Sequence, residues 1–80
     1  MTWKTIYSKR SVKLGGILRE YRETKGYSLR AFEAITGISR TIIHKIEKGE
    51  RRLDVVEFLE LCEFLDANPQ HIIKILQKNP

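Results

Sequence analysis

Apolar residues recur along most of the chain at intervals of three and four positions, and no strand-like alternation of apolar and polar residues persists. Such intervals place side chains on one face of an α-helix, because one helical turn takes about 3.6 residues. The pattern predicts an all-α, compact five-helix fold, with helices over residues 11–25, 29–36, 40–48, 55–66 and 69–78.

The apolar face of each predicted helix is expected to point into one shared core. In the first three helices this face carries Leu14, Ile17, Leu18, Tyr21, Leu29, Phe32, Ile35, Ile43 and Ile46. In the fourth helix it carries Val55, Phe58, Leu59, Leu61, Cys62 and Leu65. We therefore expect the single cysteine to be a packed core residue rather than a redox sensor.

Glycines and short polar residues mark the boundaries of these helices. Gly26, Gly37 and Gly49 each follow a predicted helix, where a residue in the left-handed conformation is expected. Serine, aspartate and asparagine side chains accept hydrogen bonds from the free N–H groups at a helix start. The residues placed to do so are Ser28, Ser39, Asp54 and Asn68.

The composition limits the class of protein. Eighty residues suffice for one domain, and 41% hydrophobic with 31% charged residues is typical of a soluble globular chain. No apolar run exceeds two residues, so we expect no membrane-spanning segment, no signal peptide and a cytoplasmic location. One cysteine and two histidines are too few for an internal disulfide or a structural zinc site of the usual spacing. No catalytic set of side chains, cofactor site or small-molecule site is recognisable, so we expect no enzyme.

The charge is distributed unevenly along the chain. Residues 1–52 contain 13 Lys and Arg against 5 Asp and Glu, a net charge of +8, and residues 53–80 contain 2 against 5, a net charge of −3. A basic segment followed by an acidic one indicates that one side of the domain meets a polyanion. Nucleic acid is the first interpretation and acidic membrane the second, with an ordinary solvated surface as the alternative to both.

Residues 28–49 have the pattern of two short helices joined by a tight turn around Gly37. A glycine tolerates the left-handed backbone that lets the second helix leave at a steep angle. Ile43 and Ile46 are expected to point into the core, so that the opposite face of the second helix is polar and cationic. That face carries Arg40, Thr41, His44 and Lys45.

With its flanks, this segment resembles the Cro/lambda-repressor-like helix-turn-helix family over roughly residues 14–76. The resemblance is carried by Leu18-Arg19-Glu20-Tyr21-Arg22, Lys25-Gly26-Tyr27-Ser28, Thr36-Gly37-Ile38-Ser39, Ile46-Glu47-Lys48-Gly49, Leu65 and Asn68-Pro69. Members of this family are mostly sequence-specific DNA-binding regulators, commonly dimeric, that place their third helix in the major groove. We therefore expect a helix-turn-helix DNA-binding domain over residues 11–80. Residues 1–10 carry three cations, Lys4, Lys9 and Arg10, and no acid, so they are expected to form a basic N-terminal arm or an extra turn.

Two positions depart from the family pattern. The family usually has a small residue where this chain has Glu33. A carboxylate there has to reach solvent or meet a cation such as Arg40 or Lys45, or the two helices lie slightly further apart. Leu29 replaces the glutamine with which many members hold a phosphate, although other members also carry leucine.

Two sets of residues are candidates for contact with DNA. Those placed to meet base edges are Arg40, Thr41, His44 and Lys45, with a solvated helix face as the alternative. Those placed to meet phosphates, which position a protein without reading sequence, are Ser28, Ser39, Lys48, Arg51 and Arg52. The alternative for the serines is helix capping alone, and for the arginines simple solvation.

Two further sets are structural. The resemblance implies an ion pair between Arg22 and Glu47, which would tie the first helix to the end of the third. The last two helices carry more apolar residues than one face needs, and we expect a two-fold homodimer through Val56, Phe64, Ile73 and Ile75. Such a dimer suits an inverted-repeat operator. The alternative is that Trp3, Ile6 and Tyr7 fold back over this surface.

These observations lead to one hypothesis of function and one rival. The hypothesis is a sequence-specific double-stranded DNA-binding transcriptional regulator, acting as a repressor, with no cofactor. The rival is a protein-interaction module, such as an antitoxin-like or anti-repressor subunit, that binds a partner protein through its apolar C-terminal helices. Binding to anionic membrane is the weakest interpretation, because no predicted helix joins a strongly basic face to a broad apolar one.

Overall fold

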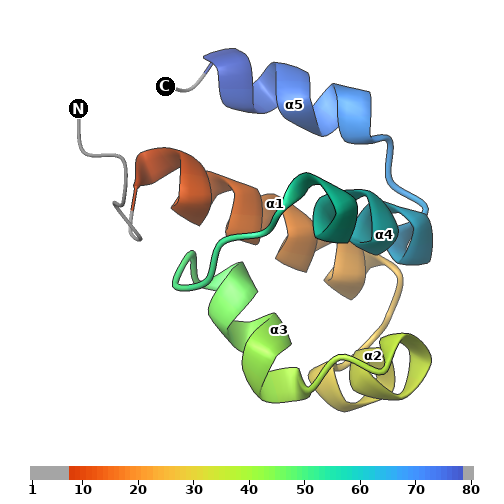
Figure 1. Ribbon diagram of the computed structural model, residues 1–80. Helices are drawn as coiled ribbons and strands as arrows, with labels where there is room; N and C mark the ends of the chain where they lie inside the picture. The colour runs from red at the N-terminus through yellow and green to blue at the C-terminus, as the bar shows by residue number, and fades with distance from the viewer. Residues whose placement is uncertain (1–7, 79–80) are drawn as a thin grey trace.

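The computed structural model describes residues 8–78, and within them the chain forms five helices and no strand (Figure 1). The helices are α1 Lys9–Thr24, α2 Leu29–Thr36, α3 Arg40–Glu47, α4 Val55–Leu65 and α5 Pro69–Lys78. The predicted all-α fold is confirmed, and the bounds of α2 to α5 agree with the sequence prediction to within one residue. No helix in this part of the chain is long and apolar enough to cross a membrane.

α1 begins at Lys9, earlier than its apolar pattern predicts. Ser8 caps the helix, since its Oγ accepts a hydrogen bond from a backbone N–H of the first turn at 3.1 Å. Arg10 lies in that turn, and its Nε donates to the Leu76 carbonyl oxygen of α5 at 3.2 Å. Of the residues predicted to form a basic arm, Lys9 and Arg10 therefore belong to α1, and Ser8 caps it. The other residues of that segment, 1–7, lie outside the described residues.

The starts of α2 to α5 use the side chains that the sequence predicts. The hydroxyl oxygens of Ser28 and Ser39 accept from backbone N–H groups three residues further on, at 3.0 and 3.2 Å. Asp54 and Glu57 form a reciprocal capping box at the start of α4. The side-chain oxygen of Asn68 accepts from two N–H groups in the first turn of α5. Each cap satisfies donors that a helix start otherwise leaves without a partner.

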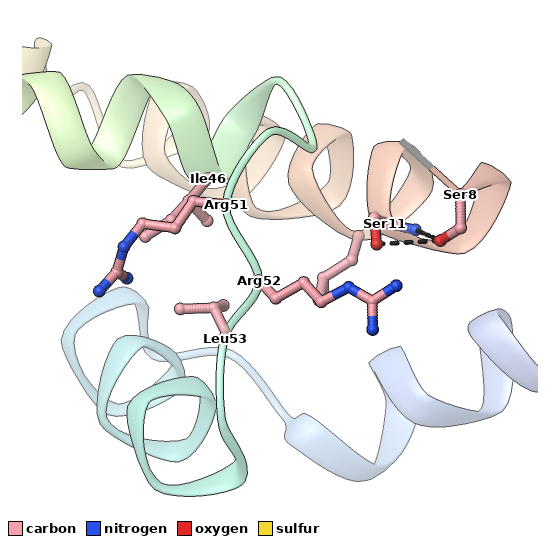
Figure 2. Close-up of a pocket in the computed structure, with 7 residues that line it drawn as sticks. Ser8, Ser11, Ile46, Arg51, Arg52 and Leu53 are labelled. Atoms are coloured by element: carbon pink, nitrogen blue, oxygen red, sulfur yellow. Dashed lines mark hydrogen bonds between the residues drawn. The ribbon is translucent and has the colours of Figure 1, made fainter. Parts of the chain in front are cut away.

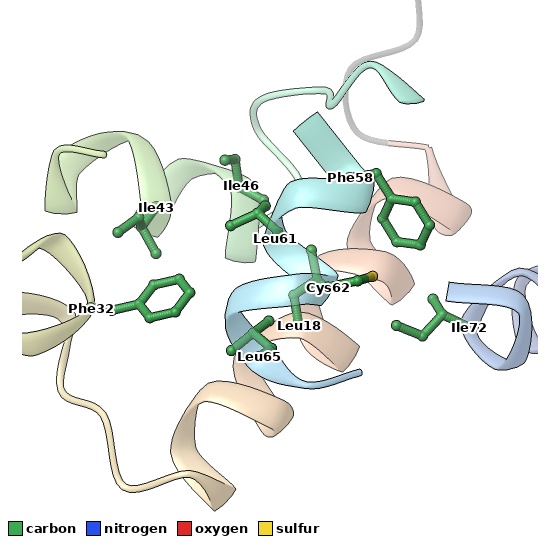
Figure 3. Close-up of a cluster of buried hydrophobic side chains, with 9 residues drawn as sticks. All are labelled: Leu18, Phe32, Ile43, Ile46, Phe58, Leu61, Cys62, Leu65 and Ile72. Carbon is green, nitrogen blue, oxygen red and sulfur yellow. The ribbon is translucent and has the colours of Figure 1, made fainter. Parts of the chain in front are cut away.

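Within the described residues, one cluster of buried apolar side chains joins all five helices (Figure 3). It consists of Leu18, Phe32, Ile43, Ile46, Phe58, Leu61, Cys62, Leu65 and Ile72. The Cys62 thiol is among the most deeply buried groups, and this burial raises its pKa. Cys62 is thus packed in the core, as expected from the sequence, whereas redox-sensing cysteines are accessible and have a lowered pKa.

Three residues that the sequence analysis assigns to the core are exposed, and for them the prediction is wrong. Val55 is 73% exposed, Ile35 46% and Leu59 43%. Val55 is the first residue of α4 and Ile35 lies in the last turn of α2, where the helix ends reach past the packed centre, and Leu59 lies at the edge of the apolar face of α4. Periodicity locates the centre of such a face, whereas its width depends on how far the neighbouring helices extend over it.

α3 packs across α1, and α2 packs against α3, which holds the helix-turn-helix unit on the rest of the domain (Figure 1). α1 approaches the backbone of α3 closely at Gly15, which is buried. A Cβ at this position would lie 2.5 Å from the Ile46 carbonyl oxygen, and would also press on that of Glu47. Glycine is therefore what allows this crossing, a role that the sequence analysis missed.

Candidate nucleic-acid interface

α3 is amphipathic in the way that the sequence predicts. Ile43 and Ile46 are buried, and Ile42 packs partly against the core. The opposite face is exposed and carries Arg40, Thr41, His44 and Lys45. Four side chains able to make hydrogen bonds thus share the outer face of one short helix, which is the arrangement that readout of base edges requires.

The turn between α2 and α3 is held by its own hydrogen bonds. Gly37 ends α2 with a φ of 77°, a left-handed conformation that favours glycine. The Thr36 hydroxyl donates to the Phe32 carbonyl oxygen at 2.8 Å and accepts from the Ile38 N–H at 3.1 Å. These bonds link the last turn of α2 to the segment that leads into α3, so α3 leaves the turn in a defined direction.

Glu33, the residue that departs from the family pattern, lies over the first residue of α3. Its Oε2 accepts a hydrogen bond from the Arg40 N–H at 3.0 Å, and its Oε1 lies 3.3 Å from the Arg40 Nε. Of the alternatives that the sequence leaves open for this carboxylate, the structure shows contact with Arg40. The carboxylate also stands at the positive end of the α3 dipole, where a negative charge is favourable.

The two serines considered for phosphate contact both act as helix caps. Ser28 and Ser39 each accept a hydrogen bond from a backbone N–H of their own helix. An accepting hydroxyl keeps its own hydrogen, which can still be donated to a phosphate oxygen. Capping is therefore the role that the structure shows, and phosphate contact stays a prediction for both residues.

Two cations that follow α3 are paired with acids in the free domain. Lys48 Nζ lies 3.1 Å from Glu50 Oε2, and Arg51 Nη1 lies 3.6 Å from Glu57 Oε2. All four side chains are at least a quarter exposed, so water screens both pairs. Each such pair is worth under about 1 kcal/mol, so a phosphate could replace either acid at little cost.

Arg51 and Arg52 diverge from the loop that joins α3 to α4 (Figure 2). Arg51 extends toward α4, where it meets its acidic partner, and Arg52 extends toward Ser8 and Ser11 at the start of α1. All four residues contribute to the lining of a cavity of about 230 Å³. The two side chains thus leave the same loop in different directions, and phosphate contact stays a prediction for both.

Arg22 and Glu47, the pair that the family resemblance implies, are in contact. Arg22 Nε and Nη2 donate to the two oxygens of Glu47 at 2.7 and 3.0 Å, and Arg22 Nη1 donates to the Tyr27 carbonyl oxygen at 2.6 Å. Both charged side chains are under a tenth exposed. The hydrogen bond to Glu47, and secondarily its charge, raise the pKa of Arg22 above its ordinary value. The pair ties the end of α3 to α1 and to the loop before α2.

The residues considered for a dimer interface do not all face the same way. Val56, Ile73 and Phe64 are 64%, 44% and 40% exposed. Phe64 lines a cavity of about 510 Å³ beside the turn between α2 and α3. Ile75 is half-buried and lines a different groove, against Ile17 and its neighbours on α1. Phe64 and Ile75 therefore belong to separate parts of the surface.

The five-helix frame, the left-handed turn and the exposed polar face of α3 together define a helix-turn-helix domain. A family described as a helix-turn-helix domain matches residues 15–78 of this chain. The chain belongs to this family, and is of the Cro/lambda-repressor type that its sequence motifs indicate.

One curated relative and two solved structures illustrate the similarity. SlrR, an HTH-type transcriptional regulator of Bacillus subtilis (strain 168), is 35% identical over 71 residues, which cover 78% of this chain and 47% of SlrR. The chain thus spans about half the length of this relative.

Two solved structures have the same fold over most of this chain. The restriction-modification controller protein C.AhdI from Aeromonas hydrophila has a TM-score of 0.73 and 32% identity, and the match covers 81% of this chain and 98% of that chain. The S. venezulae BldD DNA-binding domain has a TM-score of 0.76 and 27% identity, with 81% and 97% covered. Both matches extend over nearly all of the neighbour, so they concern more than the two helices of the motif.

Proposed function

We propose that this chain binds specific sequences of double-stranded DNA and regulates transcription. The observation that carries the proposal is the outward face of α3, whose polar side chains stand exposed while Ile43 and Ile46 anchor the helix. A helix held in this way fits the major groove, where each base pair presents a distinct pattern of donors and acceptors. Similarity to SlrR, a transcriptional regulator, and to the DNA-binding domain of BldD supports the proposal.

In the proposed complex, one set of residues contacts bases and another contacts phosphates. Arg40 bonds guanine O6 and N7, Thr41 offers a hydroxyl and a methyl group, and Lys45 and His44 reach further along the groove. Phosphates are met by Lys48, Arg51 and Arg52 and by the helix starts at Ser28 and Ser39. A domain bound over a promoter excludes the polymerase by its bulk, so repression is the mode of regulation that we propose.

Arg40→Ala and Arg51→Ala are expected to have different effects on DNA binding. Selection from a random pool of duplexes first defines the operator. Arg40→Ala should then weaken operator binding by about 1–3 kcal/mol and relax the preference at one base position. Arg51→Ala should weaken binding to operator and random duplex alike, and make binding less dependent on salt. Fluorescence anisotropy titrations at two salt concentrations measure both effects.

The same titrations contain the outcomes that contradict the proposal. If Arg40→Ala behaves like Arg51→Ala, the assignment of Arg40 to base reading is wrong. If the wild-type chain binds no duplex even at low salt, the proposed function is wrong, and the rival of a protein-interaction module has to be reconsidered. The comparisons do not favour that rival, because they are with regulators and DNA-binding domains.

We propose further that two copies of the domain associate, so that two α3 helices meet an inverted-repeat operator at a spacing of about 34 Å. The exposed apolar residues Val56 and Phe64 on α4 and Ile73 on α5 support this proposal. Leu59, exposed against expectation, lines a different groove from Phe64 and adds no support for this surface. Ile75, which is already half covered by its own chain, is the weakest of the candidate interface residues.

Val56→Lys is expected to convert a dimer into a monomer, because it places a charge within an apolar contact. Sedimentation velocity at several concentrations measures the change. Ile35→Lys is a suitable control, since Ile35 is also an exposed apolar residue but lies on α2. A control that stays dimeric supports the proposed location. A wild-type chain that sediments as a monomer even in concentrated solution contradicts the dimer itself.

A further inference from the structure

Glu33 uses both of its oxygens on a single residue of the proposed reading helix. One oxygen holds the backbone N–H of Arg40 at 3.0 Å, and the other lies 3.3 Å from the guanidinium Nε. The Glu33 side chain is 33% exposed and that of Arg40 is 48% exposed, so the pair sits at the surface and Arg40 remains accessible. Lys45, on the same face of α3, has no acidic partner among residues 8–78.

The position of this contact on the guanidinium group matters. An arginine side chain has five N–H donors in a planar fork, and the ion-pair contact of Glu33 with this group is at Nε, at 3.3 Å. The far end of the fork, formed by Nη1 and Nη2, stays available and matches guanine O6 and N7. The carboxylate therefore contacts Arg40 on the Nε side of the guanidinium group. It leaves available the Nη1 and Nη2 end, which is the end proposed to bond a base.

The charge of Glu33 has a second effect. A carboxylate beside Arg40 offsets its positive charge, which lowers the attraction of that arginine for phosphates of any sequence. Hydrogen bonds from Nη1 and Nη2 to guanine survive this offset, because they depend on geometry as well as charge. Specificity is a difference between two affinities, so a group that weakens random binding more than operator binding increases it.

We infer that Glu33 is a specificity-determining residue that positions Arg40 for guanine and suppresses binding to random DNA. The inference rests on the proposed function and adds to it a residue on α2 that does not itself touch a base. A small residue at this position would supply neither effect.

Two substitutions of Glu33 distinguish its effect on the position of Arg40 from the effect of its negative charge. Glu33→Gln keeps an oxygen for the Arg40 N–H but removes the charge, so random duplex should bind several-fold more tightly, and the preference for guanine should fall about fivefold or more. Glu33→Asp keeps the charge but shortens the reach, so the preference should fall with little gain in random binding. Both titrations use the operator, the same duplex with its guanine pair replaced, and random duplex.

Glu50→Gln is the matched control, because it also frees a cation near α3 from a surface carboxylate, in this case Lys48 at 3.1 Å. Its effect on operator and random duplex should be equal. Thermal unfolding of each variant verifies that the fold is retained. An NMR measurement of the Arg40 Nε–H in the free domain provides a readout without DNA, and its signal should shift in both Glu33 variants and not in Glu50→Gln.

The double-variant cycle with Arg40→Ala decides the inference. If Glu33 acts through Arg40, Glu33→Gln should no longer change base preference once Arg40 is alanine. Equal changes in base preference with and without Arg40 would overturn the inference while leaving the proposed function intact. A wild-type chain that binds the operator no better than random duplex would instead overturn the proposed function, and the inference with it.

Discussion

Replacing Arg22 with alanine is expected to destabilise the domain by about 3–5 kcal/mol, the usual cost of removing one partner from a buried ion pair. Arg22 is 6% exposed, and three of its nitrogens donate hydrogen bonds. Its loss would leave the Glu47 carboxylate charged and shielded from water, and the Tyr27 carbonyl oxygen without this donor. A small domain has only about 5–15 kcal/mol of stability in total, so this loss is a large fraction of it.

Urea unfolding monitored by circular dichroism measures this effect, and the chain provides a matched control on the same helix. Arg19 pairs with Glu23 at 3.3 Å, but these side chains are 60% and 55% exposed. Arg19→Ala should therefore cost no more than about 0.5 kcal/mol. Similar losses of stability in the two arginine variants would contradict the view that burial makes the Arg22 pair important.

Gly15→Ala is expected to destabilise the domain by about 1–3 kcal/mol, although alanine is the better helix former. The added methyl group would meet the Ile46 carbonyl oxygen at 2.5 Å and press on that of Glu47, both in the last turn of α3. Backbone atoms give way less easily than a flexible side chain, so α1 and α3 would have to move apart. The Arg22 to Glu47 link spans the same two helices and would be strained by that movement.

The neighbouring glycine provides the control for this prediction. A Cβ added at Gly16 meets nothing within 4 Å, so Gly16→Ala should stabilise α1 by up to about 1 kcal/mol through helix propensity alone. Thermal unfolding of both variants should therefore show shifts of opposite sign. If both variants gain stability, the close crossing of α1 and α3 described above is wrong.

Much of the fold follows from local signals in the sequence. The helix bounds, the caps and the left-handed turn at Gly37 depend on residues close together in the chain. The exposed face of α3 follows from the spacing of Ile43 and Ile46 for the same reason. A signal for Gly15 was also present, because two adjacent glycines inside a predicted helix are unfavourable unless a neighbour needs the space.

What the sequence did not determine depends on distances between helices. From the sequence, the Glu33 carboxylate could reach solvent, pair with Arg40 or Lys45, or hold the two helices further apart. Its contact with Arg40 depends on where the turn places α3. Spacing along the chain equally could not indicate that Arg51 and Arg52 diverge, because adjacent loop residues have no fixed relation to the helices around them. The exposure of Val55 likewise could not be predicted, because the sequence of α4 does not indicate which of its residues a neighbouring helix covers.

The close packing of the C-terminal end of α3 on α1 has a consequence for the DNA that the domain is proposed to bind. Backbone contact at Gly15 and the ion pair from Arg22 hold that end to α1, so the helix has little room to tilt within a groove. Any mismatch of shape then has to be absorbed by the DNA, through changes in groove width or curvature. In the proposed complex with an operator, we therefore expect base steps that deform easily at the positions that no side chain touches.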